Sequence, residues 1–81
     1  MKQIVVVQSG WVLVGDVTSV SPLELIVESA SVVRRWGTTN GLGELALKGP
    51  LTDTILDACG RASVPVHAVL MRIDCEPKRW K

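Results

Sequence analysis

The sequence has 81 residues and a mass of 8.8 kDa, which leaves room for one small domain with a thin core. Nine basic and eight acidic residues give a formal charge of +1, whereas proteins that coat nucleic acid carry a basic excess. No apolar run approaches the roughly 20 residues of a membrane-spanning helix, and the N-terminus lacks a signal-peptide pattern, so we expect a cytoplasmic protein. Thirteen valines, with no Phe or Tyr, favour β-strands and a core of small side chains.

The first 36 residues have the short apolar and alternating stretches that are typical of antiparallel strands. Ser9 and Gly10 are expected to join the first two strands in a hairpin. Gly15 lies inside the second strand, where a glycine indicates a sharp bend or bulge. The predicted strands in this half are 4–7, 11–20, 23–28 and 30–36.

A short helix is predicted from about Gly41 to Lys48, because Leu and Ala recur there at helical spacing. Thr39 or Asn40 could cap its start. Gly49 suits a left-handed exit, and the proline that follows prevents continuation.

The last third is less clear. The stretch 51–58 fits either a second short helix or a strand, 60–63 reads as a turn, and 64–74 is a strand. The expected fold is therefore mainly β: a small antiparallel SH3-like barrel or strongly bent sheet of about five strands with one short helix. Residues 1–76 form the domain and 77–81 a polar tail, in which Trp80 is either solvated or closes over a neighbour. The apolar surface of so small a domain predicts a homo-oligomer.

One segment combines basic, aromatic and helix-capping features. Arg supplies a two-pronged donor to phosphate, Trp stacks on ring systems, and the N–H groups at a helix start attract anions. These features predict a pocket for a nucleotide-like molecule; the alternative is that Trp36 belongs to the core, with Arg34 over it and Arg35 solvated. The predicted ligand-binding residues are Arg34, Arg35, Trp36, Thr38, Thr39, Asn40, Gly41 and Leu42.

Catalytic and metal-binding patterns are weak. Cys59 and Cys75 form no CxxC pair and are interpreted as reduced, buried hydrophobic residues. His67 has no nucleophile or metal partner at a suitable spacing, and the acidic residues are scattered. We therefore expect no enzyme activity, no metal and no cofactor.

The first half resembles the opening of an Sm-like or SH3-like barrel, with a glycine in the strongly bent second strand and a third strand over 23–28. Sm-like proteins form rings that bind RNA. This resemblance implies an RNA-binding ring as one alternative function.

A longer similarity covers most of the chain. The segment Ala30–Gly37, with Arg34, Arg35 and Trp36, followed by Leu42–Gly49, resembles an uncharacterised family of short phage and prophage proteins. Here Thr38 or Thr39 replaces a second aromatic residue of that family. Phages encode small oligomeric proteins that trap nucleotide signals of bacterial defence. Together with the Arg-Trp segment and the helix start, this phage context favours a non-catalytic nucleotide sponge in the host bacterial cytoplasm; a phage structural or assembly accessory protein without a small ligand is the other alternative.

Overall fold

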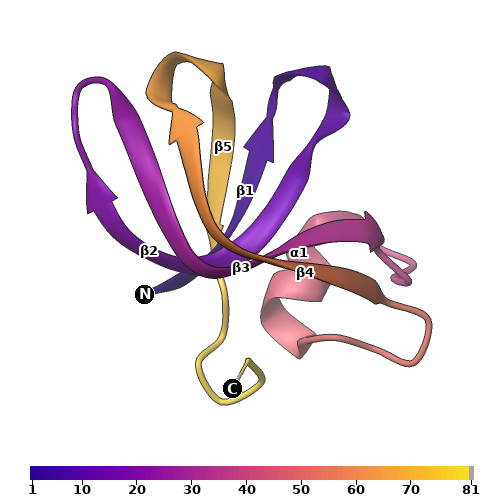
Figure 1. Cartoon of the computed structure of the whole chain (residues 1–81). Coiled ribbons are helices and arrows are strands. Elements are labelled where there is room, and N and C mark those ends of the chain that lie inside the picture. Colours follow the sequence, from indigo (N-terminus) through magenta and orange to yellow (C-terminus); the bar gives the residue numbers. More distant parts are fainter. Residues whose placement is uncertain (81) are drawn as a thin grey trace.

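The structure is a computed structural model that describes residues 1–80. Its five strands form one antiparallel sheet in the order β4-β3-β2-β1-β5 (Figure 1). One α-helix lies between β3 and β4, and short 3-10 helices lie in the turns after β1 and β4. The elements are β1 (Lys2–Val7), η1 (Gln8–Gly10), β2 (Val12–Val20), β3 (Glu24–Arg35), α1 (Gly41–Lys48), β4 (Ile55–Pro65), η2 (Val66–Ala68) and β5 (Val69–Asp74). The predicted fold class is confirmed. No helix within residues 1–80 is long and apolar enough to cross a membrane.

Most local signals in the first half act as the sequence predicts. Ser9 and Gly10 both adopt positive φ (68° and 82°) in the turn between β1 and β2. Gly15 lies where the backbone of β2 comes unusually close to its paired neighbour β3, because a Cβ there would be 2.7 Å from Val27 Cγ1 and 2.9 Å from Ala30 Cα. The helix has the predicted bounds, and Gly49 (φ 81°) ends it by donating its N–H to the carbonyl of Leu45.

Three predicted boundaries in the chain are wrong. The stretches 23–28 and 30–36 are not two strands but one, β3, which bends at Ser29 (φ 48°). The turn expected at 60–63 is instead part of β4; of the two alternatives left open for 51–58, the structure has the strand, from Ile55 onward, and not the helix. Gly60 (φ 80°) there forms a bulge within the strand. The predicted strand 64–74 is interrupted by η2.

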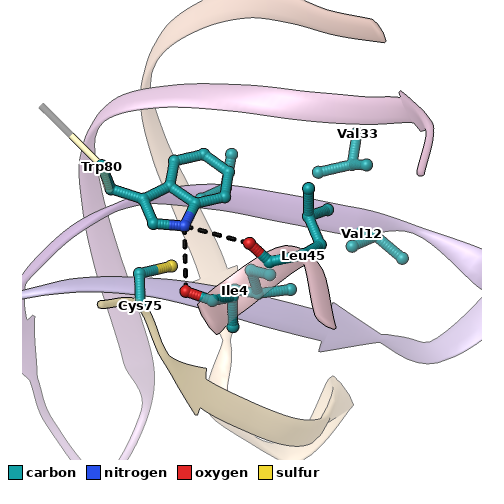
Figure 2. Packing of buried hydrophobic residues seen from close by; sticks show 8 residues of the cluster. Ile4, Val12, Val33, Leu45, Cys75 and Trp80 are labelled. Atoms are coloured by element: carbon teal, nitrogen blue, oxygen red, sulfur yellow. Dashed lines mark hydrogen bonds between the residues drawn. The ribbon is translucent and has the colours of Figure 1, made fainter. Parts of the chain in front are cut away.

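Alternation along the strands creates two buried clusters on opposite faces of the sheet. The opposite-face cluster consists of Val5, Leu13, Leu25, Val27, Ala30 and Val64. The helix-side cluster consists of Ile4, Val12, Val14, Val33, Leu45, Ala46, Cys75 and Trp80, so it joins the sheet to α1 and to the C-terminal segment (Figure 2).

Trp80 is the largest side chain of the helix-side cluster and is only 7% exposed. Its indole Nε1–H donates to the carbonyls of Leu45 and Ala46, at 3.2 and 3.1 Å (Figure 2). These carbonyls belong to the last turns of an eight-residue helix, which needs tertiary packing to be stable. The expected solvated position of Trp80 is therefore wrong: the ring packs within the chain's own core and holds α1 against the sheet.

Candidate functional site

The eight predicted ligand-binding residues occupy the connection from the end of β3 to the first turn of α1. Arg34 and Arg35 end the strand, and Gly41 and Leu42 begin the helix. The pairing of β3 with β4 is irregular here, because Val33 pairs with Leu56 while Arg35 pairs with Ile55. Strict alternation therefore does not decide which way the neighbouring side chains point.

Arg34 is engaged by a carboxylate on the adjacent strand. Its Nε donates to Oδ2 of Asp57 at 2.8 Å and its Nη2 to Oδ1 at 3.3 Å. Both side chains are exposed, so solvent screens the pair and its contribution to stability is about 0–1 kcal/mol. The two-pronged donor that the sequence assigns to a ligand is thus held by Asp57, in a pair that costs little to open.

Arg35 is exposed, and no ion pair or side-chain hydrogen bond of its guanidinium occurs within residues 1–80. It is therefore the more available of the two guanidinium groups.

The helix start is neutralised by the chain itself. The carboxylate Oε1 of Glu44 accepts hydrogen bonds from the backbone N–H groups of Thr39 and Asn40, each at 2.9 Å. Asn40 is the N-cap residue, one of the two expected, but its side chain makes no capping hydrogen bond. Thr38 instead donates its hydroxyl to the carbonyl of Gly41 at 2.7 Å. An anion that approaches this turn meets a carboxylate already in place.

Glu44 should make the helix start sensitive to acid. The backbone bond from Asn40 is the main cause that lowers its pKa from the ordinary 4.5, and Lys48, 3.4 Å away, adds to it against partial desolvation. Because the folded pKa is the lower one, ionised Glu44 stabilises the fold above about pH 4.5 and loses this effect as the pH falls through the lowered value. We expect the N–H signals of residues 39 and 40 in NMR spectra to shift with that titration, and Glu44→Gln to abolish the shift; an unchanged titration in the variant would contradict the contact.

Trp36 is 42% exposed and lies against the first turn of α1. A Cβ on Gly41 would be 3.9 Å from the ring atom Cζ3. The backbone of Trp36 is fixed separately, since its carbonyl accepts the Thr54 hydroxyl at 2.7 Å. Gly37, next in the chain, has φ 70° and packs on the backbone of 53–54 with no room for a Cβ. Trp36 is therefore not a core residue: its backbone is fixed by hydrogen bonding and its ring is about half exposed.

A concave site lies elsewhere on the molecule. A cavity of about 290 Å³ is lined by Met1, Lys2, Asp16, Cys75, Pro77 and Trp80, and none of the eight predicted residues takes part. Burial raises the pKa of the Cys75 thiol to about 11, so the thiol is protonated at neutral pH and forms an apolar wall. The sequence interpretation of the cysteines is right for Cys75, which is buried, and wrong for Cys59, which is exposed on β4. Trp80 was the one sequence signal for this cavity.

Within residues 1–80, no three His, Cys, Asp or Glu side chains are placed so that they could hold a metal ion. His67 is exposed in η2, beyond the end of β4, rather than on a strand. The site around Trp36 offers two binding groups: the half-exposed aromatic ring of Trp36 and the exposed guanidinium of Arg35.

No family model matches the chain, and searches of curated proteins and of solved structures likewise found no match. The resemblances to Sm-like proteins and to short phage proteins stay predictions.

Proposed function

We propose that this protein is a non-catalytic binding protein that sequesters a nucleotide-like signalling molecule and so blocks antiphage defence in the bacterial cytoplasm. The observation that carries the proposal is the half-exposed ring of Trp36, held beside the first turn of α1 and preceded by an exposed Arg35. An exposed indole on a fixed backbone is a stacking surface for a base, worth roughly 1–3 kcal/mol per stacked ring.

Two guanidinium groups can bind the phosphate of such a ligand, one without an ion pair and one held in a weak ion pair. Arg35 can bind it directly, while Arg34 becomes available if the exposed pair with Asp57 opens. Glu44 opposes the ligand, because its carboxylate already accepts the N–H groups of Thr39 and Asn40. Binding should therefore depend on Arg35 and Trp36, and should improve when the charge of Glu44 is removed.

Calorimetric titration with cyclic nucleotides and ADP-ribose derivatives tests the proposal. We expect Arg35→Ala and Trp36→Leu each to weaken binding about ten- to a hundredfold, which corresponds to roughly 1.5–3 kcal/mol. Glu44→Gln should strengthen it. Arg61→Ala is the matched control, since Arg61 is an exposed arginine on β4 paired with Glu28, away from Trp36.

Two results would refute the assignment: no member of the panel binds the wild type, or the folded Arg35 and Trp36 variants bind as well as it does. The same samples separate the alternatives. An RNA-binding ring predicts affinity for RNA that falls steeply with salt, and an assembly accessory predicts neither kind of binding.

A further inference from the structure

Three turns come together at one end of the sheet and carry exposed apolar side chains. They are the β1–β2, β2–β3 and β4–β5 turns, which Figure 1 shows side by side, away from α1 and the C-terminus. Backbone contacts connect them, because Val66 donates its N–H to Leu23 and Val7 pairs with Val69. We call this surface the turn end; its exposed large side chains are Trp11 (58%), Val20 (54%), Leu23 (81%) and Leu70 (64%).

The turn end contains no charged residue. The three segments 7–11, 19–23 and 63–70 include no Asp, Glu, Lys or Arg, although the chain has 17 charged residues in all. The first charge beyond the patch is Glu24, whose Oε2 accepts the hydroxyl of Ser63 at 2.6 Å. A surface with this composition favours an uncharged partner over water.

Several backbone polar groups of the turns already have hydrogen-bond partners within the chain. The N–H of Val7 donates to the carbonyl of Trp11, and the N–H of Ser21 donates to that of Glu24. The hydroxyl of Ser21 accepts the N–H groups of Leu23 and Glu24. Covering the turn end would therefore not bury these polar groups without partners, which is the usual cost of hiding a loop.

The absence of charge also selects among occupants. A membrane surface attracts Lys and Arg, which the turn end lacks. An uncharged patch is complementary to another uncharged patch, and every copy of this chain carries one. A large apolar side chain has about 150–200 Å² of surface, and the exposed fractions of the four residues together amount to roughly 500 Å² per copy. Two copies would then bury roughly 1,000 Å², which is near the lower limit of specific interfaces.

We propose that the turn end is a self-association surface on which two copies of this chain meet about a two-fold axis. Each copy places its Trp11 and Leu23 against the turns of the other, as a two-fold contact between identical patches requires. The proposal stands apart from the ligand proposed for Trp36, since the turn end contains none of the residues of that site.

Sedimentation equilibrium over roughly 1–500 µM tests it. The wild type should pass reversibly from 8.8 kDa to twice that mass. Leu23→Lys and Leu70→Lys, both at exposed positions, should each weaken the dimer at least tenfold because they place an unpaired charge in the contact. Leu47→Lys is the matched control: Leu47 is 65% exposed on α1, outside the turn end, and its replacement should leave association unchanged.

A wild type that stays monomeric over this range would overturn the proposal, as would Leu23→Lys and Leu70→Lys variants that associate like the wild type. Flotation with phosphatidylcholine vesicles supplies the other arm. Vesicle binding by a monomeric wild type, lost in Leu23→Lys, would assign the turn end to lipid instead and equally overturn it.

Discussion

Replacing Trp80 by alanine should destabilise the protein by about 3–5 kcal/mol, the usual cost of removing a large buried aromatic side chain. A domain of this length has a total stability of about 4–12 kcal/mol, so the loss takes up a large part of it and a much larger fraction of the molecules should be unfolded at physiological temperature. The loss combines the space left between the sheet and α1 with the hydrogen bonds to Leu45 and Ala46 (Figure 2). Urea unfolding followed by circular dichroism measures it without using the tryptophan signal.

Two further variants separate the causes. Trp80→Phe keeps most of the ring but removes the N–H, which should cost about 1–3 kcal/mol because the two carbonyls lose a donor. Leu47→Ala removes a large apolar side chain that is 65% exposed on α1, outside the turn end, and should change stability by less than about 1 kcal/mol. If Trp80→Ala unfolded at the same urea concentration as the wild type, the packing of the C-terminal segment on α1 would be refuted.

Gly15→Ala is expected to cost about 3 kcal/mol, although it adds a single methyl group. That methyl would meet Val27 Cγ1 at 2.7 Å, the carbonyl oxygen of Glu28 at 2.8 Å and Ala30 Cα at 2.9 Å. Two of these atoms are backbone, so β2 and β3 would have to move apart where the sheet bends. Thermal unfolding should show a markedly lower midpoint.

Gly43→Ala is the matched control for this substitution. Gly43 lies inside α1, and a Cβ there has no other atom within 4 Å. The change should stabilise the protein by about 0.5–1 kcal/mol, because alanine loses less backbone entropy in a helix than glycine. Equal melting midpoints for the two alanine variants would contradict the close approach of β2 and β3 at Gly15.

The fold class was predictable because its signals are local. Alternation, the Ser9-Gly10 turn, Gly15 and the Gly49 exit each act over a few residues. The errors arise where a distant partner decides. Ser29 could be read as a break, but pairing with β2 and β4 carries β3 through it as one bent strand. The choice left open for 51–58 is decided in the same way, because residues 55–58 become a strand by pairing with the edge of β3.

The candidate site was predictable as a segment but not as an arrangement. Its eight residues are nearly consecutive, so their proximity follows from the chain itself. Arg34 is paired with Asp57, 23 positions later in the chain, and this pairing depends on the register of β3 against β4. The carboxylate at the helix start comes from Glu44 in the first turn of α1, and only the folded structure shows that it accepts the N–H groups of Thr39 and Asn40 and so competes with an anion.

The position of β1 between β2 and β5 has a consequence for how the protein folds. Gln3 and Asp74 are partners across 71 positions, whereas β2, β3 and β4 follow one another through nearer contacts. Contacts between distant segments form slowly, because the loop must close before they stabilise anything. We therefore expect a β1–β2–β3–β4 meander to assemble first, with the β1–β5 ladder closing late. Until it closes, the Ile4–Val7 stretch keeps an open strand edge, and that interval is when the chain is most exposed to aggregation.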